Sequence, residues 1–299
     1  MKNSTVSVDE LREYITDEVF KAVGFSQDGI IRRYFGGILR RPAGRFAELA
    51  AGFDAYLAAH GLRAACREYL PHLANQAHVR GVECIPESGP LVIVSNHPGT
   101  YDGLIILANL PRDDARLVAG SVPFLHAVPS ILERMIYVTP DAGVRMLAVR
   151  ELLRHLQSGG MLLLFASRRI DPDPDVLAGA PERIRAWSPS LDVILRRIPE
   201  TRVVVTIVSG VLAESCARHP LTRLKEDLTD RLRIAEMLQL VQQLAFGKDY
   251  GLQPRVSFSE TITTADLNVS GGRRDYTEAI IEHGLALLDD HMGWRTDSL

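Results

Sequence analysis

His97 and Asp102 are the two residues of this chain whose types and spacing best suit proton transfer. They lie five positions apart in the segment NHPGTYD, which directly follows the apolar run of residues 91–95. Across a turn from a strand into a helix, a carboxylate at this spacing can accept a hydrogen bond from one imidazole nitrogen while the other nitrogen faces a cleft. The carboxylate then fixes the imidazole tautomer and stabilises the imidazolium ion, so the pair predicts an oriented general base.

The same two residues also fit a purely structural interpretation. The helix dipole favours an acidic residue in the first turn of a helix, and backbone groups can satisfy a histidine in a loop. Spacing alone favours this alternative, because short motifs often match by chance. The surrounding sequence therefore has to decide between the two.

The segment VRGVECIPESGPLVIVSNHPGTYD, residues 79–102, resembles the glycerophospholipid acyltransferase family of lysophosphatidate and glycerol-3-phosphate acyltransferases. In that family a glycine-bearing strand, a Pro/Gly turn and an apolar strand precede an Asn-His-x4-Asp block. The corresponding residues here are Gly81, Pro86, Gly89, Pro90, Asn96, His97 and Asp102. An ordered series matches, not one pair, so the resemblance favours the catalytic interpretation. It continues, more weakly, over residues 79–262.

This resemblance implies an activity. The family moves a fatty acyl group from an acyl-CoA or acyl-ACP thioester to a hydroxyl of a phosphorylated glycerol or lysophospholipid-like acceptor. His97 would deprotonate that hydroxyl, Asp102 would orient His97, and no covalent acyl-enzyme would form. The thioester is a co-substrate, so we expect no cofactor. The expected partners are an acyl donor, which can be carried on an acyl carrier protein, and a lipid-like acceptor.

The substrate contacts that we expect come from two blocks. Backbone N–H groups from Gly99 to Tyr101, at the start of the following helix, are candidate donors to the tetrahedral oxyanion. The expected substrate-binding residues are Asn96, Gly99, Thr100, Tyr101, Phe165, Arg168 and Arg169.

The second block departs from the family pattern. The family combines an aromatic residue, proline, glutamate, glycine and arginine there to bind the acceptor phosphate, whereas this chain has LLLFASRRIDPDPD. Phe165 is retained, and Arg168 and Arg169 stand at the usual glycine and threonine places. Two adjacent arginines can clamp a phosphate in a bidentate manner. The alternative is a solvated turn in which they pair with Asp171 and Asp173.

The region between the two blocks also departs from the family. A further arginine usually follows an aromatic-containing strand, but MIYVTPDAG has Tyr137, Thr139 and Pro140. Arg134 or Arg145 could serve, although neither stands at the matching position. We therefore expect an acceptor that differs from the ordinary ones.

Metal and nucleotide chemistry find little support in the sequence. The alternation of aspartate and proline in DPDPD lacks the central glycine and terminal glutamate of an EF-hand loop, so we interpret it as a stiff turn and expect no metal. No Gly-x-Ser-x-Gly, Walker A or Gly-x-Gly-x-x-Gly motif is present. These absences argue against hydrolase, NTPase and dinucleotide-binding functions.

Continuous apolar runs such as LVIV, MLLLF and VVVTIV indicate strands buried on both faces. They predict an α/β fold with a mainly parallel or mixed sheet and helices on both faces, like that of the glycerol-3-phosphate acyltransferases. The predicted strands cover residues 91–95, 116–119, 135–139, 161–166, 202–208 and 255–259, and the clearest helices cover 143–156, 221–246 and 276–292.

The first part of the chain has a helical pattern instead. Ser7 and Glu10 form a capping-box signature before a helix that Gly24 would end, and two further helices are predicted from apolar spacing over residues 46–57 and 62–73. We therefore divide the chain into a helical annex, residues 1–78, and an α/β acyltransferase domain, residues 79–299.

The amino-acid composition narrows the expected cellular location and binding partners of the protein. The 34 basic and 37 acidic residues give a net charge of −3, which argues against nucleic-acid binding by broad phosphate neutralisation. Three widely spaced cysteines indicate a reducing compartment, and no signal peptide or spanning run is found, so we expect a cytoplasmic protein. The basic and apolar segment 31–45 fits equally a peripheral contact with the inner face of the membrane and a helix packed on the domain.

Two other functions remain open at this stage. The altered second block also fits a non-catalytic acyl- or lipid-binding protein of the same fold. An acyl-thioester hydrolase would result if water entered where the acceptor should bind.

Overall fold

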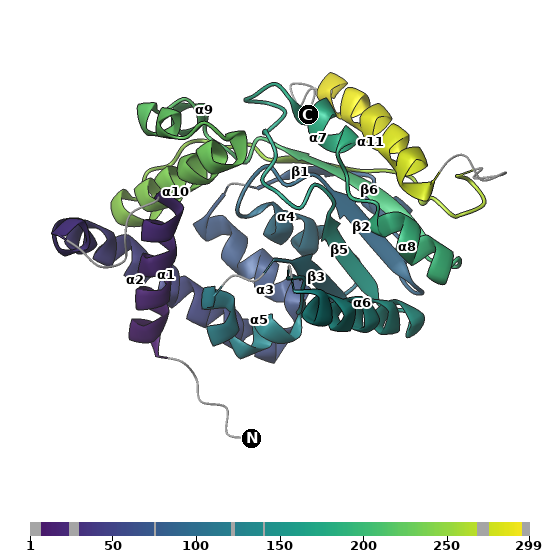
Figure 1. The fold of residues 1–299 in the computed structure, drawn as a ribbon, viewed down its shortest axis with the longest axis horizontal. Coiled ribbons are helices and arrows are strands. Elements are labelled where there is room, and N and C mark those ends of the chain that lie inside the picture. The colour runs from purple at the N-terminus through teal and green to yellow at the C-terminus, as the bar shows by residue number, and fades with distance from the viewer. Residues whose placement is uncertain are drawn as a thin grey trace.

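A seven-stranded sheet forms the centre of the protein (Figure 1). The computed structural model describes residues 7–23, 30–74, 76–120, 123–139, 141–267 and 275–294. The strand order along the sheet is β1-β7-β6-β2-β5-β3-β4. The strands are β1 (His78–Arg80), β2 (Leu91–Ser95), β3 (Ala115–Ala119), β4 (Met135–Tyr137), β5 (Met161–Phe165), β6 (Arg202–Ser209) and β7 (Arg255–Phe258).

The strand β2 lies in the middle of the sheet, between β6 and β5, and is parallel to both. The strands β3 and β4 continue this parallel arrangement, whereas β7 is antiparallel to β6, and β1 is parallel to β7. The sheet is therefore mixed, and the predicted α/β class is confirmed. Parallel strands direct their carboxyl ends to one edge of the sheet, where ligand sites form in such folds.

Helices cover both faces of the sheet, as the apolar strands predict. Side chains alternate along a strand, so Leu91 and Ile93 join one apolar core while Val92 and Val94 join the other. The first core is completed by α3 (Leu62–Tyr69) and α4 (Asp102–Asn109), and the second by α6 (Ala142–Gln157), α7 (Ala180–Arg185), α8 (Ser190–Arg197) and α11 (Tyr276–Gly293).

Two N-terminal helices, α1 (Val8–Val23) and α2 (Ile30–His60), lie beside α10 (Leu228–Phe246) at one end of the molecule (Figure 1). The predicted capping box is confirmed. The N–H of Ser7 donates to the Glu10 carboxylate at 3.0 Å, and the N–H of Glu10 donates to the Ser7 hydroxyl at 3.2 Å. The reciprocal bonds satisfy donors that the first helical turn leaves free.

The helix α2 is longer than predicted, because it includes the basic segment 31–45 and continues through Pro42. The predicted stop Gly24 and the side chains of Ile31, Arg32, Arg33, Tyr34, Phe35 and Ile38 lie outside the described residues. Among the described side chains, Arg40 and Arg41 are exposed, whereas Arg45 donates through Nη1 to the carbonyl oxygen of Leu244 in α10 at 2.6 Å. One arginine of the segment thus ties α2 to α10.

Two predicted helix boundaries are wrong. The helix expected over residues 62–73 ends at Tyr69, and the 3₁₀ turn η1 (Leu70–His72) follows, because Pro71 has no N–H for the helical ladder. The helix expected over residues 221–246 is divided into the 3₁₀ turn η4 (Pro220–Leu224) and α10, which begins after the N-cap Asp227. Elements too short to be predicted are α5 (Pro129–Glu133), α9 (Glu214–Ala217), η2 (Val82–Cys84), η3 (Pro123–Ala127) and the edge strand β1.

The proposed division at residue 78 stays a prediction. Leu57, Leu62 and Cys66, which precede it, pack in the same apolar core as the sheet residues Leu91 and Ile93. None of the helices in the described part of the chain combines the length and apolar composition needed to cross a bilayer.

Candidate functional site

His97 leaves the carboxyl end of β2, where two neighbouring strands also end. Ser95 is paired with Phe165 at the end of β5, so the histidine two residues further on reaches the Phe165 side chain. The two rings stack with their centroids 4.2 Å apart and their planes inclined by 22°. The His97 side chain keeps 28% of its surface exposed, so the imidazole is held by packing and still open to solvent.

Asp102 holds one side of this imidazole. Its Oδ2 atom lies 2.8 Å from Nδ1 of His97 and also accepts the N–H of Gly99 at 3.3 Å, while Oδ1 accepts the N–H of Gly103 at 2.6 Å. Asp102 is the first residue of α4 and its side chain is 1% exposed, so the helix dipole favours its negative charge. Among the described residues Nε2 of His97 has no hydrogen-bond partner, so it is free to receive a proton.

Asp171 fixes the backbone of His97. Its carboxylate accepts the N–H of His97 at 2.9 Å, and its own N–H donates to the carbonyl oxygen of His97 at 2.7 Å. Burial raises the pKa of Asp171 to about 6, although the hydrogen bond from the His97 N–H opposes this increase. The segment after β5 is therefore bonded directly to the segment after β2.

Asp173 holds the segment that follows β6. Its two carboxylate oxygens accept the N–H groups of Asp175, Gly210, Val211 and Leu212 at 2.8 to 3.0 Å. Both Asp171 and Asp173 are buried, and among the described residues neither forms an ion pair with Arg168 or Arg169, so the pairing that the alternative interpretation expected is not formed. The DPDPD segment instead joins the carboxyl ends of three strands.

Arg168 and Arg169 lie in an exposed turn at the end of β5. Arg168 has a φ angle of 57°, the left-handed conformation that glycine adopts without a steric cost. A hydrogen bond from the N–H of Asp230 and, more weakly, the charge of Arg169 lower the pKa of Asp227. The phosphate clamp stays a prediction.

The remaining residues of the first block differ in their surroundings. Asn96 donates through Nδ2 to the carbonyl oxygen of Val208 and accepts the N–H of Val208 through Oδ1, both at 2.9 Å, so its amide joins β2 to β6. Tyr101 is buried, and its hydroxyl donates to the carbonyl oxygen of Val211 at 2.7 Å. These contacts are structural, and a substrate contact through either side chain stays a prediction.

Gly99 and Thr100 form the turn between His97 and Asp102. A Cβ atom on Gly99 would lie only 2.7 Å from Cγ2 of Val211, so a side chain has no room there. The N–H of Gly99 is bonded to Asp102, and the Thr100 residue is exposed. Of the three predicted oxyanion donors, the Gly99 N–H is thus already engaged.

Acidic groups surround His97. Burial disfavours its charged form, but the charge and hydrogen bond of Asp102, followed by the charges of Glu236 and Asp171, outweigh burial and raise the pKa of His97 to about 9. An imidazolium ion is therefore stable in this site, as a base that has just accepted a proton requires.

Glu236, on α10, is a residue of this site that the sequence analysis missed. Burial raises its pKa to about 8, the charge of Asp102 also raises it, and the charge of His97 and a hydrogen bond with Thr100 lower it. A signal for it exists in the sequence: Glu236 and Gln239 stand three residues apart on the helical stripe that Leu232 and Ala235 share, and all four are buried. Polar residues on an apolar stripe point to a buried polar site.

The arginines considered between the two blocks lie elsewhere. Arg134 donates through Nη1 to the carbonyl oxygen of Asp113 at 2.9 Å, and Arg145 is exposed on α6. The hydroxyls of Tyr137 and Thr139 are buried and have no partner among the described residues, and Pro140 lies outside those residues. No arginine is thereby assigned to the missing family position.

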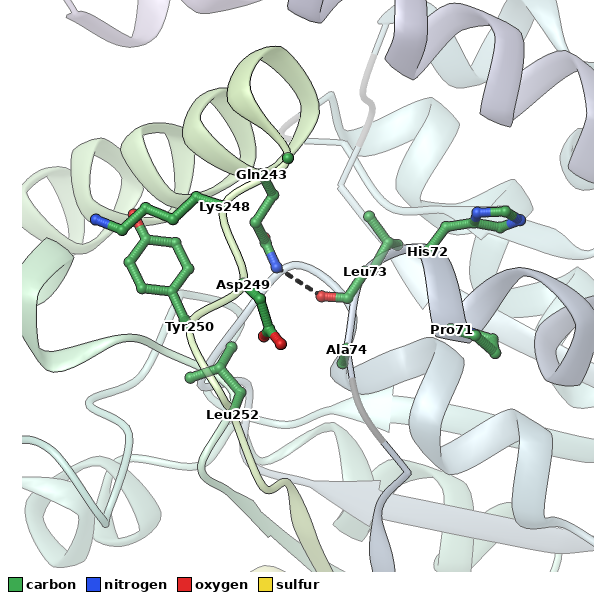
Figure 2. A pocket seen from close by; sticks show the side chains of 10 residues that line it. Pro71, His72, Leu73, Ala74, Gln243, Lys248, Asp249, Tyr250 and Leu252 are labelled. Carbon is green, nitrogen blue, oxygen red and sulfur yellow. Dashed lines mark hydrogen bonds between the residues drawn. The ribbon is translucent and has the colours of Figure 1, made fainter.

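A polar pocket opens between η1 and the segment that follows α10 (Figure 2). Its volume is about 240 Å³, and its walls include His72, Gln243, Lys248 and Asp249. Gln243 donates through Nε2 to the carbonyl oxygen of Leu73 at 2.7 Å across this pocket. None of the site residues predicted from the sequence lines it.

Within the described ranges no group of His, Cys, Asp and Glu side chains suits a metal ion.

Comparisons with known proteins give a likeness among solved structures. Neither a protein-family model nor a curated protein matches the chain. Among solved structures, it is similar to the crystal structure of the 1-acyl-sn-glycerophosphate (LPA) acyltransferase PlsC from Thermotoga maritima, with a TM-score of 0.46, 12% sequence identity and 97% of each chain covered.

Proposed function

We propose that this protein is an O-acyltransferase that moves a fatty acyl group from a thioester to the hydroxyl group of an acceptor. The observation that carries the proposal is the 2.8 Å contact between Nδ1 of His97 and Oδ2 of Asp102. The His97 side chain is 28% exposed, and its Nε2 atom has no hydrogen-bond partner among the described residues. The resemblance of residues 79–102 to the glycerophospholipid acyltransferases supplies the class of reaction. The geometry of the pair is that of a base oriented by a carboxylate.

In the proposed reaction, Nε2 of His97 accepts the proton of the acceptor hydroxyl as its oxygen bonds to the thioester carbonyl carbon. The negative charge moves to the carbonyl oxygen of the tetrahedral intermediate. When this intermediate collapses, the carbon–sulfur bond breaks, and the thiolate takes the proton from the imidazolium ion. Asp102 stays ionised and stabilises the imidazolium ion throughout.

We assign the oxyanion contacts to the backbone N–H groups of Thr100 and Tyr101. Gly99 donates its N–H to Asp102, so it contributes by allowing the turn to pass close to Val211. Donors at the start of α4 also place the positive end of the helix dipole near the developing charge. Phe165 would position the ring of His97 through its stacking contact.

For the acceptor we propose a phosphorylated glycerol or a lysophospholipid-like molecule, with its phosphate on Arg168 and Arg169. Both guanidinium groups are exposed at the end of β5, the strand next to His97. Planar guanidinium groups match the geometry of a phosphate. An acyl-CoA or acyl-ACP thioester is the proposed donor, and the basic part of α2 would hold the protein at the inner, cytoplasmic surface of the membrane.

The direct test incubates the protein with labelled acyl-CoA and acyl-ACP and with phosphorylated and unphosphorylated glycerol and lysolipid acceptors. We expect transfer to a phosphorylated acceptor, and His97→Ala and Asp102→Asn should each lower kcat by roughly 10²-fold or more. His283→Ala, an exposed histidine on α11, is the matched control and should change nothing.

Each other outcome points to a different function. Transfer that His97→Ala leaves undiminished excludes His97 as the base. Release of free fatty acid without an acceptor favours a thioester hydrolase. Binding of the acyl thioester without turnover, across the whole acceptor panel, favours a non-catalytic acyl-binding protein.

A further inference from the structure

A buried carboxyl group lies beside the His97 site without a complete set of hydrogen bonds. The Glu236 residue is only 9% exposed, and its Oε1 atom has no hydrogen-bond partner among the described residues. That oxygen would lie 3.9 Å from a Cβ atom on Gly99, so it faces the turn between His97 and Asp102. Burying a carboxylate without partners is costly, and a group in such a place is commonly retained for a role in the site.

The position of Glu236 is fixed by its own helix. One turn further along α10, Gln239 donates through Nε2 to the hydroxyl of Tyr101 and, at 2.9 Å, to the carbonyl oxygen of Val211. Its Oε1 atom accepts the N–H of Ala213 at 2.7 Å. Because Tyr101 precedes Asp102, these bonds hold α10 against the same turn that carries the His97 and Asp102 pair.

The charges that act most strongly on Glu236 come from this site and from its own helix. Asp102 opposes its ionisation, whereas His97 and, from α10, Arg233 favour it. His97 in turn senses the charges of Asp102, Glu236 and Asp171. Two buried groups that interact in this way titrate as a pair, because a neutral imidazole with a carboxylic acid has the same net charge as an imidazolium with a carboxylate.

We propose that Glu236 is a positioning residue whose buried carboxyl group competes with the His97 imidazole for one proton and thereby sets the pH range in which His97 can act as a base. This inference rests on the proposed function, because it gives His97 a reaction to perform. While the two groups share a single proton, a proton on the carboxyl group leaves the imidazole neutral and able to accept another from the acceptor. A proton on the imidazole instead leaves that ring charged and idle beside the ionised carboxylate.

The test is an NMR titration of the His97 ring in the full chain. Glu236→Gln keeps the shape of the side chain but can never carry a negative charge, so the pKa of His97 should fall by about one pH unit or more. Thr100→Val removes a hydroxyl group that favours ionised Glu236 and should move the pKa of His97 in the same direction by a smaller amount. Glu214→Gln, an exposed glutamate paired with Arg218, is the matched control and should have no effect.

Kinetics provide the second measurement. In Glu236→Gln the acidic limb of kcat/KM should move to lower pH in parallel with the pKa of His97, and activity at low pH should be retained or increased. If Glu236 had only a structural role, its replacement would lower kcat/KM at every pH without shifting the acidic limb of the profile. An unchanged or raised pKa of His97 in a folded Glu236→Gln variant overturns the inference while leaving the acyl transfer intact. A lowered pKa without transfer to any acceptor retains the coupling and removes the proposed function.

Discussion

Asp171 and His97 are joined by two hydrogen bonds, although 74 residues separate them in the sequence. The Asp171 carboxylate accepts the N–H of His97 at 2.9 Å, and the N–H of Asp171 donates to the His97 carbonyl oxygen at 2.7 Å. The loop that carries the proposed base is thus held by the loop that follows β5. A catalytic group on a loop needs such support, because small displacements of a reacting group reduce the rate strongly.

Replacement of Asp171 tests this support. Asp171→Ala leaves the His97 N–H without its acceptor, and we expect a loss of about 1–3 kcal/mol in the free energy of unfolding and a lower kcat. Asp171→Asn keeps an acceptor oxygen at the same place, so its losses should be smaller. Chemical denaturation and initial-rate kinetics on the two variants provide the measurement, and equal effects of both would show that the carboxylate charge, not the hydrogen bond, is what matters.

The turn at the end of β5 gives a second prediction, because Arg168 adopts a φ angle of 57°. A side chain in this conformation costs about 1–2 kcal/mol, which glycine avoids. Arg168→Gly should therefore be more stable than Arg168→Ala by about 1 kcal/mol, although both remove the guanidinium group. Thermal unfolding compares them.

The same two variants also separate backbone strain from phosphate binding. Both should raise the KM for a phosphorylated acceptor by a similar factor, since both lack the charged group. If the KM for the phosphorylated acceptor is that of the wild type, Arg168 has no part in binding the phosphate.

The raised pKa of His97 predicts how stability depends on pH. Asp102, Glu236 and Asp171 raise this pKa to about 9 in the folded protein from 6.5. The protonated imidazole therefore stabilises the fold fully below about pH 6.5, and this contribution is lost as the pH rises through about 9. Relative to His97→Gln, the wild type should lose stability over this interval. Urea denaturation of both proteins between pH 6 and pH 10 measures the difference, and a constant difference would contradict the raised pKa.

The sequence predicts this fold well where every residue of a strand is buried. It predicts the fold less well where hydrogen bonds join segments that are distant in the sequence. The predicted bounds of the central strand, residues 91–95, are those of β2, because the run LVIV is apolar and a turn into a helix follows Ser95. The position of Asp102 one turn after His97 likewise follows from local spacing. Both features depend on neighbours in the sequence.

The spacing of neighbouring residues in the sequence does not reveal the contacts between segments that meet at the edge of the sheet. Asp173 binds N–H groups of residues 210–212, and Glu236 reaches the His97 turn from α10, at sequence separations that spacing rules do not address. The alternation of aspartate and proline in DPDPD predicts only a stiff turn, whereas the carboxylates of its first two aspartates are buried and accept backbone N–H groups. A helix boundary fails for a related reason: the side chain of Asp227 accepts the N–H groups of Thr229 and Asp230 and begins a new helix there.

The basic side of α2 gives the last prediction. Arg12, Arg40 and Arg41 line an open hollow of about 490 Å³ together with Arg45 and Glu48. An arginine near an anionic bilayer contributes about 1 kcal/mol, so Arg40→Gln with Arg41→Gln should weaken binding to phosphatidylserine-containing vesicles by roughly 30-fold. The effect should shrink as salt is added, because these charges are exposed to solvent.

The matched control for this experiment is Arg196→Gln with Arg197→Gln. These residues also form an adjacent pair of helical arginines, but α8 lies at the opposite end of the molecule from α2 (Figure 1). Vesicle sedimentation should show nearly wild-type binding for this control and weak binding for the α2 variant. Equal losses in the two variants would mean that only net charge matters, and the assignment of α2 as the membrane-facing element would then be wrong.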